Sequence, residues 1–186
     1  MITTRLHGRL GNQMFQFAAA YGLAARLGVS VALDSREALA RGEGSLLRVF
    51  DLPVSEREIL PPDRQTARLA YLMWRYGGGQ PKLRRERGLG YNPAFETWGD
   101  GSYLHGYWQS ERYFAHVADE VRSAFTFPPV EDARNADMAD RIARTLAISL
   151  HVRRGDYVAL DAHVLCSPDY YAAALDRMTR EMTGTP

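Results

Sequence analysis

The apolar and polar positions at the start of the chain predict a strand, a helix and a second strand. Ile2–Leu6 has the length and side chains of a short strand, and apolar residues then recur at helical spacing over Gln13–Leu27. Gly28 is expected to end this helix, and Val29–Leu33 is expected to form the next strand. These elements make a βαβ unit within the first 33 residues, which predicts an α/β fold.

The middle of the chain mixes loops with short periodic segments. Leu46–Leu52 is a candidate short strand, and a helix is expected over Asp63–Tyr76. A further strand is expected at Ser102–Tyr107, followed by a helix that Ser110 caps. The helix over Asp63–Tyr76 carries an apolar stripe that is expected to lie in the core, formed by Leu69, Leu72, Met73 and Tyr76.

The last part of the chain follows Phe127–Pro129, which marks the expected end of a first domain. A polar helix is expected over Glu131–Arg144 and a buried, parallel-type strand over Leu146–Val152. Ser167-Pro168-Asp169 has the N-cap serine and first-turn proline of a helix start.

The strand expected at Leu146–Val152 leads directly into charged residues. Ligands of open α/β sheets bind at the carboxyl ends of strands, so His151, Arg153, Arg154 and Asp156 are expected at a cleft. A pair of guanidinium groups suits a diphosphate, because each binds phosphate oxygens through two parallel hydrogen bonds. The alternative is a structural salt-bridge cluster in which Asp156 neutralises an arginine.

The turn before the first helix offers a second candidate binding surface. Gly11 and Asn12 would present unpaired N–H groups and the positive end of the helix dipole to an anion. Alternatively, Asn12 is only an N-cap. The glycine spacing fits neither a dinucleotide fingerprint nor a P-loop.

Three segments resemble the bacterial α-1,2-fucosyltransferase family, glycosyltransferase family 11. They are Gly8–Gln16 (the first motif), Gly106–Phe114 (the middle motif) and His151–Tyr157 (the arginine motif), which contains the His-x-Arg-Arg-x-Asp pattern of fucosyltransferases. The segments occur in the family's order. The resemblance extends over about Ile2–Leu175 and is weaker over Asp34–Asn92.

The resemblance implies a GT-B-like fold of two facing Rossmann-like domains. Residues 1–130 would form the N-terminal, acceptor-side domain, and residues 131–186 a linker helix with only the first strand–helix unit of the GDP-fucose-binding domain. On this reading the chain is truncated at its C-terminus. It would by itself show negligible transfer and at most weak GDP binding.

The implied reaction moves L-fucose from GDP-fucose to the 2-hydroxyl of a galactose-terminated acceptor, with inversion and without a metal or a further cofactor. The absence of an Asp-x-Asp motif agrees with metal independence. Arg153 is the expected diphosphate contact and Arg154 its support or a second contact. Asn12, with Gly11, would close the site from the opposite domain, and His151 would orient an arginine or touch the nucleotide.

The general base is left unassigned. Asp156, which is counted among the catalytic candidates, and Asp161 are available carboxylates, but no spacing places either beside an acceptor hydroxyl. Weaker cleft candidates are Trp108, Gln109 and Glu111 of the middle motif. The aromatic residues Tyr91, Phe95 and Trp98 either stack on sugar rings or cover the sheet edge.

Composition narrows the remaining function classes. With 23 basic and 22 acidic residues the formal charge is +1, which offers no electrostatic footprint for nucleic acid or for an anionic membrane surface. The basic run Lys82–Arg87 is interpreted as a solvated surface turn, because Glu86 interrupts it. A single cysteine, Cys166, and the lack of a signal-like start favour a cytoplasmic protein, with peripheral association at the inner membrane left open. The rivals are a non-catalytic sugar- or nucleotide-binding protein, another nucleotide-dependent α/β enzyme, and an adhesion module that uses Arg154-Gly155-Asp156.

Overall fold

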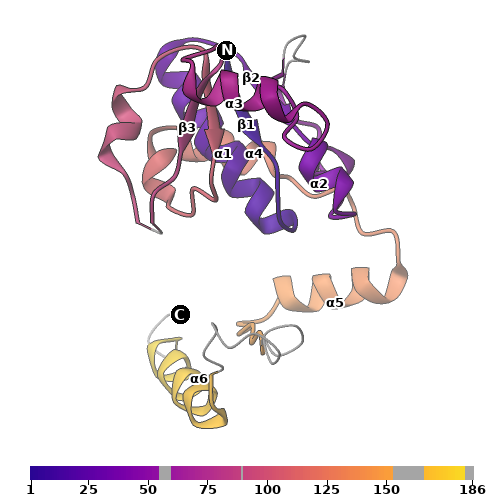
Figure 1. Ribbon diagram of the computed structural model, residues 1–186. Coiled ribbons are helices and arrows are strands. Elements are labelled where there is room, and N and C mark those ends of the chain that lie inside the picture. Colours follow the sequence, from indigo (N-terminus) through magenta and orange to yellow (C-terminus); the bar gives the residue numbers. More distant parts are fainter. Residues whose placement is uncertain (55–59, 89, 153–165, 183–186) are drawn as a thin grey trace. The chain divides into compact units, whose positions relative to one another are not determined.

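The computed structural model describes residues 1–54, 60–88, 90–152 and 166–182 (Figure 1). The chain divides into two compact units, Met1–Pro128 and Pro129–Pro186. The first unit holds the sheet and most of the buried side chains. The assignment of acceptor-side and donor-side domains stays a prediction.

The first unit is built on a four-stranded, fully parallel sheet, so the predicted α/β class is confirmed (Figure 1). The spatial order is β2-β1-β4-β3, which places β4 directly beside β1. All carboxyl ends therefore meet at one edge of the sheet. The strands are β1 (Ile2–Arg5), β2 (Val31–Asp34), β3 (Lys82–Arg85) and β4 (Ser102–His105).

Helix α1 (Leu10–Leu27) covers one face of this sheet and begins three residues before the predicted start. Phe17 and Leu23 are fully buried against the strands. Gly22 allows close packing, because a Cβ there would lie 2.4 Å from the carbonyl oxygen of Tyr113. Gly28 ends the helix with a φ of +64°, a conformation that glycine adopts without strain.

Helix α3 (Arg68–Tyr76) packs on the opposite face through Tyr71 and Trp74, which contact Tyr103 and Leu83. Trp74 Nε1 also donates a hydrogen bond to the Pro81 carbonyl at 2.9 Å. The predicted core stripe of this helix is wrong, because its members point to solvent. The exposed residues are Leu69, Leu72, Met73 and Tyr76.

Short helices and turns complete the first unit. The strand predicted at Leu46–Leu52 is wrong: Ser45 Oγ caps a 3-10 turn, η1 (Leu46–Arg48), and Leu46 and Phe50 are buried without strand pairing. The helix predicted after Ser110 forms as two 3-10 turns and a short α-helix. The elements are α2 (Arg36–Ala40), η2 (Pro93–Thr97), η3 (Glu111–Tyr113), η4 (Ala115–Val117) and α4 (Ala118–Ala124).

The second unit contains α5 (Ala133–Ala143) and α6 (Pro168–Met182), as the sequence predicted. Asp132 and Ser167 accept hydrogen bonds at their respective starts. The strand predicted at Leu146–Val152 is wrong, since these residues are coil with Leu146, Leu150 and Val152 exposed. A parallel strand needs a neighbour, and none of the described residues pairs with this segment. No helix of the described ranges has the length and apolarity to cross a bilayer.

Candidate functional site

The first and middle motifs meet at the carboxyl edge of the sheet, where β1 and β4 end side by side. Asn12 Oδ1 accepts a hydrogen bond from Gln109 Nε2 at 2.7 Å, although 97 positions separate the two residues. The sequence nominated both side chains for a cleft, but separately. The structure brings them together, because β4 is the direct neighbour of β1.

Asn12 is free for this contact because it does not cap its helix. The N-cap position is Arg9, which makes no side-chain cap, and Asn12 lies in the first turn of α1. The N-cap alternative for Asn12 is therefore wrong. Gly8 is required beside it, since its φ is +75° and a Cβ would lie 2.5 Å from Asn12 Nδ2. Gly11 has no such constraint, because a Cβ there meets nothing within 4 Å.

Two buried glutamines hold the turn that precedes α1. Gln13 Nε2 donates to the Gly8 carbonyl at 2.9 Å, and Gln13 Oε1 accepts from the Leu46 backbone at 2.9 Å. Gln16 exchanges two hydrogen bonds of 3.0 Å with the backbone of His7. Buried amides that are fully paired rigidify their surroundings. The glutamines of the first motif thus position the site, a role that sequence reasoning missed.

A carboxylate holds the turn that presents Gln109. Glu86 accepts hydrogen bonds from the backbone N–H groups of Tyr107 at 2.6 Å and Trp108 at 3.0 Å. Trp108 has a φ of +56°, which is uncommon for a side chain of its size, so the surrounding contacts must maintain it. Strained backbone of this kind is frequent at functional sites.

The aromatic residues around this turn belong to the core rather than to a cleft. Trp108 is fully buried and its ring contacts Phe95, Trp98 and Tyr113, so its predicted cleft role is wrong. Phe95 and Trp98 are buried too, which favours the covering role over sugar stacking. Glu111, the third weak candidate of the middle motif, is exposed in η3.

Two histidines lie at the ends of the same neighbouring strands. The rings of His7 and His105 stand 5.7 Å apart, and His7 also contacts the Tyr107 ring at 4.7 Å. Burial lowers the pKa of His7, and burial with nearby Arg5 lowers the pKa of His105 to about 3. His105 is therefore neutral at pH 7. Its place at the carboxyl end of a strand was the signal that could have revealed it.

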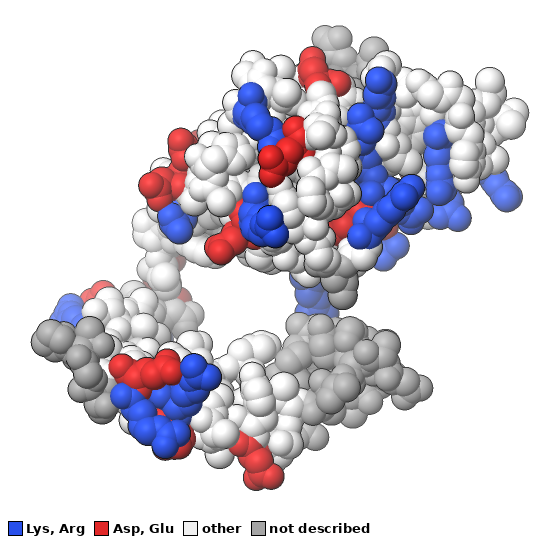
Figure 2. All heavy atoms as spheres, turned by 90° about the vertical axis from the view of Figure 1, so that its left-hand side faces the viewer, with Lys and Arg blue, Asp and Glu red and all other residues white. Residues whose placement is uncertain are grey.

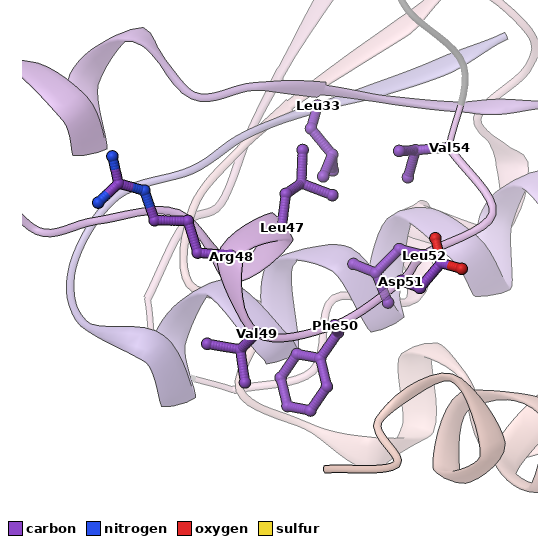
Figure 3. Close-up of a pocket in the computed structure, with 8 residues that line it drawn as sticks. All are labelled: Leu33, Leu47, Arg48, Val49, Phe50, Asp51, Leu52 and Val54. Atoms are coloured by element: carbon purple, nitrogen blue, oxygen red, sulfur yellow. The ribbon is translucent and has the colours of Figure 1, made fainter. Parts of the chain in front are cut away.

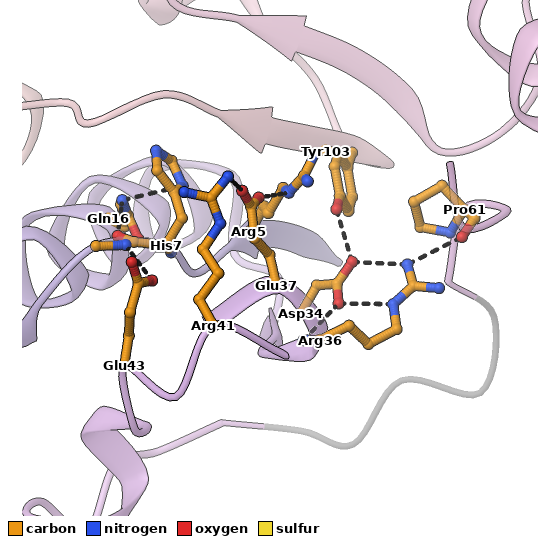
Figure 4. Close-up of polar contacts among 11 residues, drawn as sticks. Arg5, His7, Gln16, Asp34, Arg36, Glu37, Arg41, Glu43, Pro61 and Tyr103 are labelled. Carbon is orange, nitrogen blue, oxygen red and sulfur yellow. Dashed lines mark hydrogen bonds and ion pairs between the residues drawn. The ribbon is translucent and has the colours of Figure 1, made fainter. Parts of the chain in front are cut away.

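A polar network fills the sheet edge beside these histidines (Figure 4). The buried Asp34 carboxylate accepts hydrogen bonds from Arg36 Nε at 2.9 Å, Arg36 Nη2 at 2.7 Å and Tyr103 Oη at 2.6 Å. Burial alone would raise the pKa of Asp34, but these donors outweigh it and lower the pKa. Glu37 is likewise paired with Arg5 and Arg41. Neither carboxylate is an uncommitted base.

Described residues of the first unit line hollows that include the following two. One of about 690 Å³ is bounded by the Asp34 network, α3 and the ends of β1 and β4. The other, of about 550 Å³, is formed by Leu33 and residues 47–54, and Figure 3 shows the Arg48 side chain directed away from it. The first is lined by His105 and is the better placed for a polar ligand.

The arginine motif is only partly visible in this geometry. His151 lies in an exposed coil. Arg153, Arg154 and Asp156, together with Asp161, lie outside the described residues, so their roles stay predictions. Within the described ranges, no group of three or more His, Cys, Asp or Glu side chains could hold a metal ion.

Comparison with known proteins shows similarity to one family of glycosyltransferases. Residues 95–184 match the model of glycosyl transferase family 11, a span that includes the middle and arginine motifs. The predicted resemblance to this family is thereby confirmed.

A curated relative is similar over most of the chain. An alpha-1,2-colitosyltransferase of Escherichia coli is 31% identical over 181 residues, which cover 92% of this chain. The chain spans 61% of the length of that relative. No solved structure matches the chain significantly.

Proposed function

We propose that this chain is part of a glycosyltransferase that moves L-fucose from GDP-fucose to the 2-hydroxyl of a galactose-terminated glycan. The family match and the alpha-1,2 linkage in the relative's name support this reaction. The observation that carries the proposal is the Asn12–Gln109 hydrogen bond, which joins two family motifs at the edge where parallel sheets bind ligands. A two-domain GT-B arrangement and a cytoplasmic location are parts of the same proposal.

The Asn12–Gln109 contact also fixes what Asn12 can offer a substrate. Because Oδ1 accepts the Gln109 amide, the Nδ2 group is left to donate, and it makes no hydrogen bond to a described residue. A directed donor suits the oxygen of a sugar hydroxyl or a phosphate. We therefore assign Asn12 to the donor sugar or the leaving diphosphate, with Gln109 as its positioning residue.

Departure of the diphosphate sets the electrostatic demand of the reaction. Inverting displacement at the anomeric carbon builds positive charge on the sugar ring and negative charge on the leaving GDP. Preorganised donors at that diphosphate lower the barrier. Arg153 would bind it through two hydrogen bonds and Arg154 would support it or add a contact. His151, Gly11 and Asp156 remain proposed neighbours of this site.

A general base is not assigned by the described residues. Asp34 and Glu37 are committed to arginine partners. His105 faces the same hollow, but its low pKa makes it a weak base, whereas a general base works best with a pKa near the operating pH. We propose that the described part of the site binds and orients its substrates.

The sugar specificity has a second candidate, because the relative is named for colitose transfer. Colitose is L-fucose that lacks the 3-hydroxyl. A site that hydrogen-bonds a substrate hydroxyl rejects the analogue without it, often strongly. The two donors therefore test whether the protein contacts that hydroxyl.

The test is an assay of the intact protein with GDP-fucose and its GDP-linked 3-deoxy analogue, and with a galactoside as acceptor. We expect a 1,2-linked product and a higher rate with GDP-fucose than with the 3-deoxy donor. Preference for the 3-deoxy donor would select colitose transfer instead. Donor binding without turnover would identify a non-catalytic binder, and binding of another nucleotide in place of GDP would contradict both assignments.

The same assay should include Arg153→Ala and Arg153→Lys. Loss of a charged contact to the leaving group costs about 2 to 4 kcal/mol of transition-state stabilisation. The lysine variant should recover little, because a point charge cannot reproduce a planar two-bond contact. Near-normal turnover and GDP affinity in the alanine variant would reduce the arginine motif to structural ion pairing.

A further inference from the structure

Helix α3 presents an apolar face to solvent, directly opposite the face that it buries. Leu69 is 74% exposed, Met73 68% and Tyr76 73%, whereas Tyr71 and Trp74 are nearly buried. At 100° per residue, these exposed side chains and Leu72 fall within one arc on the far side of the helix. Single exposed apolar residues are ordinary, but a contiguous stripe usually marks an interaction surface.

The segment around this stripe is strongly basic. Residues 64–87 carry seven Lys and Arg against a single carboxylate, a net charge of +6, while the whole chain carries +1, so the remainder carries −5. The one carboxylate, Glu86, is already bound to two backbone N–H groups. None of the seven cations forms an ion pair with a residue in the described ranges. They are Arg64, Arg68, Arg75, Lys82, Arg84, Arg85 and Arg87.

The basic side chains lie on the helix and on the strand beneath it. Arg68 and Arg75 are on α3 and border the exposed stripe on the Leu72 side. Lys82 and Arg85 are on β3, the edge strand against which α3 packs. Figure 2 shows one face of the molecule on which Lys and Arg side chains gather toward one side with few acidic neighbours.

Protection of a sheet edge explains only part of this pattern. Charged residues on β3 discourage edge-to-edge pairing, which accounts for Lys82 and Arg85. Edge protection accounts neither for the arginines of α3 nor for the exposed apolar stripe beside them. A second copy of the chain is also a poor occupant, because a two-fold interface would bring two clusters of like charge together.

We propose that α3 and β3 form a surface that binds an anionic phospholipid bilayer. The stripe of Leu69, Leu72, Met73 and Tyr76 enters the boundary between headgroups and acyl chains. Arg68 and Arg75 beside the stripe, with Arg85 on the same face of β3 as Leu83, bind lipid phosphates, and their aliphatic stems cover the rim of the contact. This binding needs neither the donor nor the acceptor of the proposed reaction, so it stands or falls independently of that function.

The test is sedimentation of the 186-residue chain with vesicles of phosphatidylcholine, with and without phosphatidylglycerol. Wild type should bind the anionic vesicles, weaken as salt is raised, and bind the neutral vesicles poorly. Leu69→Glu with Met73→Glu should weaken anionic binding by at least about tenfold. Both side chains are exposed, so the variant should keep the wild-type circular dichroism spectrum and melting temperature.

Matched variants on α6 distinguish binding by this surface from nonspecific binding through other exposed apolar residues. Tyr170→Glu with Met178→Glu changes two other exposed apolar residues. This variant should weaken vesicle binding by no more than about twofold, through the negative charges that it adds. Arg64→Gln with Arg68→Gln should weaken binding about fivefold per charge removed. Arg177→Gln with Arg180→Gln removes the same charge from α6 and should have a smaller effect.

Three results would overturn the proposal. Wild type would bind neutral and anionic vesicles equally, or the α3 and α6 variants would lose binding equally. Alternatively, analytical ultracentrifugation would show a dimer that Leu69→Glu with Met73→Glu dissociates, which would make the stripe an interface between copies.

Discussion

The two faces of the parallel sheet are covered in different ways. On the α1 face, aliphatic and aromatic side chains such as Ile2, Phe17 and Leu104 are completely buried in one large cluster. On the α3 face, the cluster is reduced to Tyr71, Trp74 and Tyr103, beside a hollow whose lining includes the paired Asp34 and Arg36.

This difference separates stability from binding. The α1 face supplies the dry, close-packed core that fixes the strands. The α3 face leaves room for polar groups whose charges are already compensated, as the Asp34–Arg36 pair shows. The Asn12–Gln109 contact lies at the carboxyl edge of the sheet, where β1 and β4 end. The rigid, close-packed α1 face can thus hold the site in place, while the α3 face of the sheet stays open.

The largest expected effect comes from opening the α1 face. Phe17→Ala should lower the free energy of unfolding by about 3 to 5 kcal/mol, because it leaves a cavity in a fully buried cluster. Trp74→Ala should cost less despite the larger side chain, about 2 to 3 kcal/mol, since it faces an open hollow. Urea denaturation measures both. A larger loss for Trp74→Ala would reverse the assignment of the two faces.

A smaller effect is expected from the polar side of the comparison. Tyr103→Phe removes only the hydroxyl that donates to Asp34, and should cost about 1.5 to 3 kcal/mol because the acceptor is a buried charge. Tyr113→Phe is the control on the α1 face, where the hydroxyl contacts only backbone groups. It should cost about 0.5 to 1.5 kcal/mol. Equal losses would show that the hydrogen bond to Asp34 stabilises the fold no more than a hydrogen bond to a backbone group.

Acidification should reveal the contribution of the half-buried His105 on the α3 face. His105 has a pKa of about 3 in the folded chain, against 6.5 when unfolded, so the unfolded state binds the proton more readily. Stability is fully present above pH 6.5 and is lost as the pH falls toward 3. His105→Gln should flatten this slope between pH 6.5 and 4. The slope should be followed by urea denaturation at each pH, and an unchanged slope in His105→Gln would contradict the burial of this ring.

Asp34 contributes to stability in a lower pH range. Its pKa is depressed below 3.8, so its stabilisation is present above that value and is lost only as the pH falls further. The two groups can therefore be separated in one titration.

The first βαβ unit was predictable because each of its elements is encoded locally. Apolar spacing gave the helix, and glycine gave its end at Gly28. The burial of α3 was not predictable in this way. Its apolar stripe has the helical period, but a different face of the helix packs on the sheet. That face carries Tyr71 and Trp74, which contact Tyr103, a residue distant in the sequence.

Strand pairing was the second limit. The segments at Leu46–Leu52 and Leu146–Val152 have strand-like composition, yet a strand forms only beside a neighbour that composition does not reveal. The meeting of Asn12 with Gln109 has the same origin. Each motif could be nominated from the sequence, but their contact depends on β4 pairing directly with β1.

The central claim, that two distant motifs build one site, is tested most directly by a double-mutant cycle. Transfer rates and GDP affinities should be measured in the intact protein for Asn12→Ala, Gln109→Ala and the double variant. If Gln109 acts by orienting Asn12, Asn12→Ala slows transfer while GDP affinity changes by at most a few fold, and Gln109→Ala adds almost nothing to it. Independent, additive losses, or a change in thermal stability without any change in rate, would contradict the shared site.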